Sequence, residues 1–348
     1  MNKYIYISFI VPIFNEELKI RKTILSILKQ NTSVEFEIII IDGMSNDKTR
    51  KILRELKSLY SNIILLNNEK KIVSVGFNKG LSISKGQIII RVDGHSTLKS
   101  DFVKNCIDTF GRVNADCVGG PTNHVSQSYI GDLIKIAQTS KFGTGGVSFR
   151  SKITNGKYVN TLAFGAYKRE IFKKIGGYDE ELIRNQDDEF NFRLIQNGGT
   201  IWIDPLIKSS YYSRDSILKF IKQYFQYGFY KVRVMQKRSS LASIRHIMPA
   251  SFVISLIFSL IFYYLLDNHF VFFSLIFPYI FLALSASMVG LNFKIKNLFS
   301  VLPLSFIYFA MHFSYGFGSL LGLLFFIKKW GSNKTFDINF DKNLFSKI

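Results

Sequence analysis

The sequence has few cysteines and lacks the two commonest glycine motifs for binding phosphate. Cys106 and Cys117 are its only cysteines, and their spacing does not suit a metal site, so we expect reduced structural thiols. No Gly-x-Gly-x-x-Gly follows the first predicted strand, and no Gly-Lys-Ser/Thr is present. These absences argue against a disulfide scaffold, a dinucleotide-binding fold and a P-loop.

Acidic residues are scarce relative to basic ones. The chain has 45 Lys and Arg against 25 Asp and Glu, a formal charge of +20, so its partners are expected to be anionic: phosphates, acidic lipids or nucleic acid. Residues 208–246 contain nine Lys or Arg, with Asp215 as the single acid, and aromatic residues lie between them. Such a mixture can bind single-stranded nucleic acid. Because long uncharged runs follow at once, we expect helices on anionic membrane lipids instead, and no nucleic acid.

The basic region also admits two other interpretations. Its charges could bind the diphosphate of a lipid-linked acceptor. Alternatively, most of them could be the ordinary positive flank on the inner side of membrane helices. The residues alone leave these possibilities open.

Charge is absent from three long runs near the carboxyl end. They cover residues 247–266, 268–293 and 297–327. Each is long enough to cross a hydrocarbon core of about 30 Å as a helix. The chain therefore predicts a multi-pass membrane protein with a head in front of its membrane helices.

The orientation follows from the flanking residues. The apolar run Tyr4–Phe14 has no cleavage pattern of a signal peptide, so we expect the head to be cytoplasmic and the first two runs to cross outward and back. The third run is ambiguous. One crossing would place Lys328 and Lys329 outside, against the positive-inside bias, and two crossings need more residues than the run has. A broken or re-entrant segment is a further possibility.

The first 207 residues alternate between apolar, β-branched runs and amphipathic segments. The first four predicted strands are Tyr4–Val11, Phe36–Ile41, Ile63–Leu66 and Ile88–Val92, and two more are predicted at Ala115–Gly120 and Thr200–Ile203. Strands that alternate with helices at short spacing predict a parallel α/β sheet covered by helices on both faces. Ligands bind such sheets at the carboxyl ends of the strands.

Asp93 and His95 follow the fourth predicted strand, two positions apart. A carboxylate and an imidazole at this edge suit a divalent cation that keeps positions open for substrate oxygens. Imidazole favours Mn²⁺ over Mg²⁺, which prefers oxygen ligands. Alternatively, Asp93 binds the metal alone and His95 hydrogen-bonds a phosphate.

Four motifs in order resemble the family 2 glycosyltransferases with the GT-A fold, over about Ser8 to Pro205. They are Val11-Pro12-Ile13-Phe14-Asn15-Glu16, Asp42-Gly43-x-Ser45-x-Asp47-x-Thr49, Asn78-Lys79-Gly80 and Asp93-Gly94-His95. The resemblance implies a Rossmann-like mixed sheet and a metal-dependent, inverting transfer of a hexose-type sugar from a nucleotide-diphosphate sugar. The positions that it implies for binding the donor are Pro12, Phe14, Asn15, Glu16, Asp42, Asn78, Lys79, Arg91 and Asp93. Mn²⁺ or Mg²⁺ would be held by Asp93 and His95.

The resemblance also implies a general base. The family's Glu-Asp pair, counted back from its helix arginine at Arg193, places the base at Asp187, with Gln186 in place of the usual Glu. Asp188 is the adjacent candidate, although on a helix it points about 100° away. Helix capping is the alternative role for both carboxylates, and it is favoured for Asp188.

A narrower resemblance, to succinoglycan-type membrane glycosyltransferases, rests on His95 and on the segment Phe142–Arg150. Because the active site is expected beside the membrane, we expect an acceptor in the bacterial inner membrane: an undecaprenyl-diphosphate-linked oligosaccharide for O-antigen, capsule or exopolysaccharide. The alternatives are transfer to polyprenyl phosphate itself, or an inactive scaffold that binds nucleotide sugars. We predict a cytoplasmic catalytic domain over 1–207, interfacial helices over 208–246, transmembrane helices over 247–327 and a polar tail over 328–348.

Overall fold

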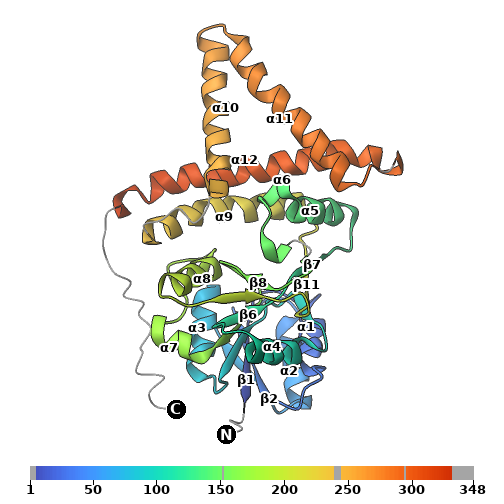
Figure 1. Ribbon diagram of the computed structural model, residues 1–348, viewed down its shortest axis with the longest axis vertical. Helices are drawn as coiled ribbons and strands as arrows, with labels where there is room; N and C mark the ends of the chain where they lie inside the picture. The colour runs from blue at the N-terminus through green and yellow to red at the C-terminus, as the bar shows by residue number, and fades with distance from the viewer. Residues whose placement is uncertain (1–4, 151–152, 239–243, 294, 331–348) are drawn as a thin grey trace. The chain divides into compact units, whose positions relative to one another are not determined.

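The computed structural model describes residues 5–150, 153–238, 244–293 and 295–330. The chain forms two compact units (Figure 1). Of the described residues, the first unit contains 5–123 and 153–212, and the second contains 124–150 and 213–330. The predicted boundary at 207 lies close to the division at 212. Residues 124–150, which we assigned to the catalytic domain, instead belong to the second unit. Most of the predicted polar tail lies outside the described residues.

The first unit is built on an eight-stranded mixed sheet in the order β3-β2-β1-β4-β9-β6-β10-β8. Its strands are β1 (Tyr6–Ile13), β2 (Glu35–Asp42), β3 (Ile63–Asn67), β4 (Ile88–Arg91), β6 (Cys117–Gly119), β8 (Lys157–Tyr158), β9 (Ala166–Lys168) and β10 (Ile201–Ile203). The first four strands pair in parallel, as predicted. Strand β9 runs antiparallel to both β4 and β6, so the predicted mixed sheet is confirmed.

Strand β1 continues through Pro12, where we expected it to end. Proline lacks the N–H that a strand donates to its neighbour. The amide of Val92 donates to the carbonyl of Ile10 at 3.0 Å, so Ile10 faces β4, and Pro12, two residues later, faces the same side. Strand β4 has ended by that point, so the missing N–H costs no ladder bond. The strand therefore extends to Ile13.

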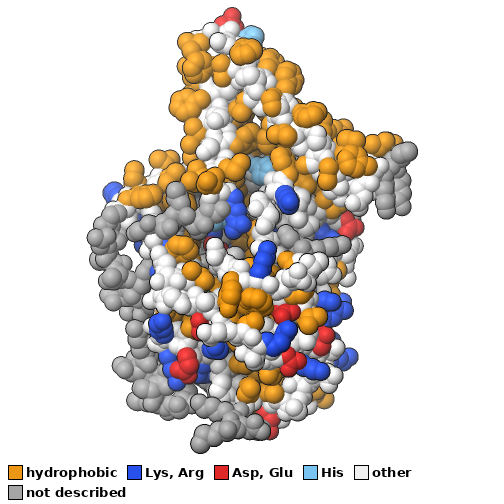
Figure 2. All heavy atoms as spheres, in the orientation of Figure 1, with side chains coloured by type: hydrophobic (Ala, Val, Ile, Leu, Met, Phe, Trp, Pro, Cys, Tyr) orange, Lys and Arg blue, Asp and Glu red, His pale blue; other side chains and the backbone are white. Residues whose placement is uncertain are grey.

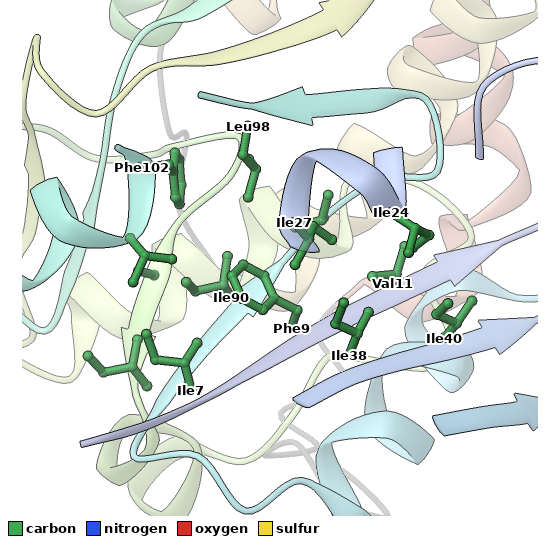
Figure 3. Close-up of a cluster of buried hydrophobic side chains, with 14 of the residues drawn as sticks. Ile7, Phe9, Val11, Ile24, Ile27, Ile38, Ile40, Ile90, Leu98 and Phe102 are labelled. Carbon is green, nitrogen blue, oxygen red and sulfur yellow. The ribbon is translucent and has the colours of Figure 1, made fainter. Parts of the chain in front are cut away.

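The main core lies between the sheet and helices α1 (Ile20–Leu28) and α4 (Phe102–Arg112). Figure 3 shows Phe9, Ile38 and Ile90 projecting from neighbouring strands toward Ile24 and Ile27 of α1. All five side chains are fully buried. Each buried side chain of this size stabilises the fold by about 1.5–3 kcal/mol. The unbroken apolar strands are thus explained by burial on both faces.

The opposite face of the sheet is covered by α3 (Val73–Ile83). A Cβ on Gly80 would lie 2.7 Å from Ile41 and 2.8 Å from Ile10, so only glycine lets this helix pack so closely. The remaining helices of the unit are α2 (Thr49–Leu59), α7 (Arg169–Ile175) and α8 (Gln186–Gln196). A small second sheet has the order β5-β11-β7, formed by β5 (Ser96–Leu98), β11 (Ser209–Tyr212) and β7 (Thr122–Val125). Helices on both faces are therefore confirmed.

Apart from the end of β7, the second unit has only helices as regular elements in its described residues. Its elements are α5 (Tyr129–Thr139), α6 (Lys141–Thr144), η1 (Ser148–Arg150), α9 (Ile217–Arg238), η2 (Ile244–His246), α10 (Met248–Leu265), α11 (His269–Gly290), η3 (Ile295–Ser300), α12 (Val301–Phe325) and η4 (Ile327–Lys329). The buried residues Leu133, Ile134 and Ala137 of α5 pack with residues of α9 and α12. This shared core explains why the α5 segment belongs with the helical unit.

Among the residues that the structure describes, three helices are long and apolar enough to be candidate membrane spans. They cover Met248–Leu265, His269–Gly290 and Asn297–Phe325. Hydrophobic side chains dominate the visible surface of α10 and α11 (Figure 2). The third run is not broken, because Pro303 falls in the first turn of α12, where a helix tolerates proline.

Candidate active site

The carboxyl end of β4 places Asp93 in a close-packed turn. The carbonyl oxygen of Gly94 accepts a hydrogen bond at 2.9 Å from the hydroxyl of Thr23 in α1. A Cβ on Gly94 would lie 2.8 Å from Ile13 and 2.9 Å from Glu16. The turn therefore needs glycine between Asp93 and His95, and it sets both side chains at the edge that the sequence predicted.

Arg91, the last residue of β4, joins the two predicted functional carboxylates. Its Nη2 donates to Oδ1 of Asp93 at 2.7 Å, and its Nη1 lies 3.1 Å from Oδ2 of Asp187. The Arg91 side chain is 8% exposed, whereas those of Asp93 and Asp187 are 24% and 33% exposed. The three groups form one partly open cluster. Two carboxylates that lie 94 positions apart in the sequence are thus brought within reach of one guanidinium.

The charges of this cluster stabilise one another. Burial alone would raise the pKa of Asp93, but Arg91 and His95 beside it hold that pKa below its ordinary value. Burial would likewise lower the pKa of Arg91, but Asp93, Tyr178 and Asp187 raise it well above its ordinary value. Asp93 therefore stays ionised at neutral pH. An ionised carboxylate is what a divalent cation requires.

His95 is held by Glu16, from the end of β1. Its Nδ1 lies 2.7 Å from Oε1 of Glu16, and both side chains are 16% exposed. Because a carboxylate can only accept, Nδ1 carries the proton, and Nε2 is the ring atom left to face a ligand. A carboxylate behind a histidine fixes its tautomer and ring orientation, as found for many metal-ligating histidines.

The donor set fits a cation that is shared with a substrate. No group of three or more His, Cys, Asp or Glu that could hold a metal occurs among the described residues. Asp93 and His95 would supply one oxygen and one nitrogen. The remaining positions would then be filled by diphosphate oxygens and water, which suits a metal that binds together with a nucleotide.

Asp187 and Asp188 lie in the first turn of α8, where acidic residues favour the helix dipole. The residue at the N-cap is Asn185, which has a left-handed φ of 63°, so neither aspartate occupies the capping position. Oδ2 of Asp187 contacts Arg91. Oδ1 of Asp187 accepts a hydrogen bond from the Asp188 amide at 3.0 Å. Asp187 therefore contacts the cluster through Arg91.

The position of α8 is fixed by a buried ion pair one turn later. Arg193 Nη2 lies 3.0 Å from Glu189 Oε2, and their side chains are 5% and 0% exposed. The guanidinium also donates to the carbonyl of Gly177 at 2.6 Å and to that of Ile175. Burial lowers the pKa of Arg193 to about 10, so it remains charged at neutral pH. Arg193 thus ties α8 to the loop that leads to Tyr178.

Tyr178 is a site residue that the sequence analysis missed. The guanidinium carbon of Arg91 lies 5.8 Å from the centre of its ring, and the ring stacks on Phe77 at 4.1 Å. Asn78 holds the Tyr178 backbone from both sides: its amide donates to the carbonyl at 2.8 Å, and its oxygen accepts from the N–H at 2.8 Å. The signal available was the loop Gly176-Gly177-Tyr178. Asn78, predicted near the nucleotide, supports the loop beneath Arg91.

Two loops at the ends of β1 and β2 are bonded together. The Asn15 amide hydrogen bonds to Ser45 Oγ at 2.9 Å, and the side chain of Asn15 exchanges hydrogen bonds with Asn46 at 2.8 and 3.0 Å. The Glu16 amide donates to Thr49 Oγ1 at 2.8 Å. The motif that begins at Asp42 therefore holds the loop that carries Glu16, the partner of His95.

The other predicted donor-binding residues have different surroundings. The Asp42 carboxylate is buried, accepts from Ser45 Oγ at 2.6 Å and lies 3.0 Å from Arg50 Nε. Phe14 is 46% exposed beside this loop. Lys79 donates to the carbonyl of Asn67 at 2.7 Å, at the end of β3. Pro12 is buried within β1. These roles in donor binding stay predictions.

A mixed α/β sheet with a carboxylate and a histidine after β4, and with Arg91 joining that carboxylate to one at the start of α8, is the arrangement expected of a glycosyltransferase with the GT-A fold. The chain belongs to glycosyl transferase family 2, whose family model matches residues 8–176. This confirms the predicted resemblance.

Two relatives support the family assignment. The chain is 33% identical over 322 residues to the dolichyl N-acetyl-alpha-D-glucosaminyl phosphate 3-beta-D-2,3-diacetamido-2,3-dideoxy-beta-D-glucuronosyltransferase of Methanococcus voltae, covering 90% of this chain and 96% of that protein. It is 29% identical over 242 residues to the succinoglycan biosynthesis protein ExoA of Rhizobium meliloti, covering 69% of this chain and 73% of that protein. The predicted likeness to succinoglycan-type enzymes is confirmed.

The fold is also shared with a solved structure. The mannosyltransferase PcManGT from Pyrobaculum calidifontis, solved in complex with GDP-Man and Mn²⁺, superposes with a TM-score of 0.58 at 14% identity. The match covers 93% of this chain and 88% of that chain. At this identity the likeness concerns the fold alone.

Proposed function

We propose that this glycosyltransferase moves a sugar from a nucleotide-diphosphate donor, with inversion, to a sugar already carried by a membrane lipid. The observation that supports this most directly is the Arg91 bridge between Asp93 and Asp187. Inverting transfer needs a cation for the departing diphosphate and, on the opposite face of the sugar, a carboxylate for the acceptor hydroxyl. Asp93 and Asp187 supply these two functions from one cluster.

In this proposal Asp93 and His95 would hold Mn²⁺ or Mg²⁺, and Glu16, bonded to Nδ1 of His95, would leave Nε2 available as the ligand atom. The cation would neutralise the charge that develops on the diphosphate as it leaves. The imidazole ligand favours Mn²⁺. The structural relative PcManGT was solved with Mn²⁺, which is consistent with this choice.

Asp187 is the proposed general base. It would accept the proton of the acceptor hydroxyl while that oxygen attacks the anomeric carbon and the diphosphate departs. Its side chain is 33% exposed, so an acceptor can reach it. Arg91 keeps it oriented between turnovers, so we regard Arg91 as a positioning residue.

The candidate membrane helices and the relatives support a lipid-linked acceptor. The Methanococcus voltae relative is named for transfer to a dolichyl-phosphate-linked sugar, and the Rhizobium meliloti relative for succinoglycan biosynthesis. We propose an undecaprenyl-diphosphate-linked oligosaccharide in the bacterial cytoplasmic membrane, with the head in the cytoplasm. The product would serve a surface polysaccharide such as O-antigen, capsule or exopolysaccharide.

The test uses the full chain in lipid nanodiscs with Mn²⁺ and a panel of nucleotide sugars. Three acceptors are compared by mass spectrometry: polyprenyl phosphate, a polyprenyl-phosphate-linked sugar and an undecaprenyl-diphosphate-linked oligosaccharide. We expect one sugar to be added to the third. Product from bare polyprenyl phosphate alone would replace this acceptor with the lipid phosphate. Donor binding without transfer or donor hydrolysis would instead indicate an inactive scaffold.

The proposed base is tested with two matched variants. Asp187→Asn should reduce turnover at least about 100-fold, the scale expected of a general base, while nucleotide affinity stays within about threefold. Asp188→Asn, one position along the same helical turn, should retain turnover within about tenfold. Equal losses in the two variants would contradict the assignment of Asp187 as the base.

A further inference from the structure

Helices α9 and α12 lie side by side over most of their lengths (Figure 1). A Cβ on Gly318 would lie 2.2 Å from the Phe225 carbonyl oxygen, and one on Gly322 would lie 2.6 Å from that of Phe229. Near the ends of the two helices, Gln236 Nε2 donates to the Phe326 carbonyl at 3.0 Å. Later residues of α9 contact later residues of α12, so the two helices run parallel.

Helix α9 is strongly basic. It contains no Asp or Glu, and its basic residues are Lys219, Lys222, Lys231, Arg233, Lys237 and Arg238. Only the eight residues 223–230 between the two basic groups are uncharged. Eight helical residues span about 12 Å, which is well short of the hydrocarbon core of about 30 Å. Helix α9 is therefore not suited to cross a bilayer.

Because α12 packs along α9, α12 is also not suited to cross the bilayer. If α12 crossed the membrane, its partner α9 would cross with it and carry charged side chains into hydrocarbon, which is strongly unfavourable. We propose that α12, although apolar enough to be a candidate span, lies with α9 in the plane of the membrane surface. Only α10 and α11 would then cross the bilayer.

The beginning of α10 gives an independent argument. A Cβ on Gly316 would lie 2.1 Å from the carbonyl oxygen of Pro249, in the first turn of α10. Gly316 lies near the middle of α12. If α10 starts to cross at its first turn, the middle of α12 is at the edge of the bilayer and not at its centre. An in-plane α12 satisfies this contact, and a centred span does not.

The surface of the α9–α12 pair fits one partner, an anionic lipid leaflet. Helix α12 exposes large apolar side chains, including Leu302 at 71%, Phe306 at 54% and Leu324 at 67%. These would enter the acyl region, and the exposed Lys219 and Lys222 of α9 would meet the phosphates of the headgroups, whereas Lys231 is buried. Lys328 and Lys329 then stay on the same side as α9, which removes the conflict with the positive-inside bias.

The first test maps the sides of the membrane with single cysteines in the full chain. The native thiols Cys106 and Cys117 are 1% and 0% exposed, so the unmodified protein serves as the background control. Asp267→Cys lies at the tip between α10 and α11, and Lys329→Cys lies just after α12. A membrane-impermeant maleimide should label the Asp267 variant in intact cells and the Lys329 variant only in inverted vesicles.

Labelling of Lys329→Cys in intact cells would show that α12 crosses, and would overturn the proposal. Absence of labelling of Asp267→Cys in intact cells would overturn it as well, because α10 and α11 would then not span. Glu55→Cys on α2, which is 46% exposed, reports the side on which the head lies. None of these readouts depends on sugar transfer, so the proposal can fail while the proposed function holds.

The second test measures depth. A fluorescent label at Leu302→Cys, Phe317→Cys or Leu324→Cys is quenched by lipids that carry a nitroxide at a shallow or a deep position. An in-plane helix predicts the same shallow-to-deep quenching ratio at all three sites, within about 1.5-fold. A spanning helix predicts deep quenching at the middle site, Phe317, and shallow quenching at the two ends. That pattern would overturn the proposal.

Discussion

Arg91→Met tests whether one buried cation holds the two carboxylates of the active site. The substitution keeps a long apolar side chain but removes the partner of Asp93 at 2.7 Å and of Asp187 at 3.1 Å. Removing one partner from a buried ion pair costs about 3–5 kcal/mol. Because Asp93 and Asp187 are 24% and 33% exposed, water compensates part of that loss. We therefore expect the lower end, about 3 kcal/mol.

The expected loss of stability corresponds to a decrease in the melting temperature, Tm. For a domain of this size, 1 kcal/mol corresponds to about 2–4 °C, so the head of Arg91→Met should melt about 6–12 °C lower at pH 7. Trp202, in β10, reports on the head when Trp330 is replaced by phenylalanine in both proteins. Arg21→Met is the matched control. Arg21 and Glu55 pair at the surface with side chains 47% and 46% exposed, so it should shift Tm by less than about 2 °C.

The difference in Tm between the native protein and Arg91→Met should depend on pH. In the native protein the pKa of Asp93 is lowered, so its contribution to stability is present above about pH 4 and is lost as the pH falls further. Without Arg91, burial raises the pKa of Asp93. The Arg91→Met variant is then destabilised at pH values above this raised pKa, where Asp93 is charged. The difference in Tm should therefore shrink as the pH is lowered from 7 toward 4.5. A difference below 2 °C at pH 7, or one that grows on acidification, would refute the reasoning.

Three further outcomes are expected. Glu16→Gln should weaken Mn²⁺ binding about 10- to 100-fold, because His95 loses its orienting carboxylate; electron paramagnetic resonance with a nucleoside diphosphate present measures this, and unchanged affinity would contradict it. Gly94→Ala should reduce transfer activity through the contact at 2.8 Å with Ile13, whereas Gly111→Ala, which meets nothing within 4 Å, should not. Arg193→Met should destabilise the head by about 3–5 kcal/mol in chemical unfolding, and a loss below 1 kcal/mol would show that its buried pair is unimportant.

Local patterns were sufficient to predict the parallel half of the head. Apolar, β-branched runs such as Phe36–Ile41 can only be buried between helices, so the strand positions and the covered faces followed from residue type alone. The place of Asp93 followed as well, since a strand delivers the next residues to its carboxyl edge. The end of β1 was misjudged at Pro12 because the sequence does not show where the neighbouring strand stops.

The contacts that assemble the site could not be read in this way. Strand β9 has three residues, too few for any periodicity, yet it separates β4 from β6. The pairing of Arg91 with Asp187 joins positions far apart in the chain, and Tyr178 lies beside Arg91 there. His95 was identified as a candidate ligand, but its bond to Glu16 depends on how β1 ends. Side-chain partners at this distance are a property of the fold and not of local sequence.

The membership of α5 in the helical unit bears on how a soluble fragment should be made. Truncation after residue 207 or 212 would retain α5 but delete α9 and α12, and Leu133, Ile134 and Ala137 would lose the residues that bury them. Such a fragment would expose a new apolar surface patch and tend to aggregate. A better water-soluble version would also replace 126–150 with a short polar linker. The head is therefore better treated as two sequence pieces around an insertion than as one amino-terminal block.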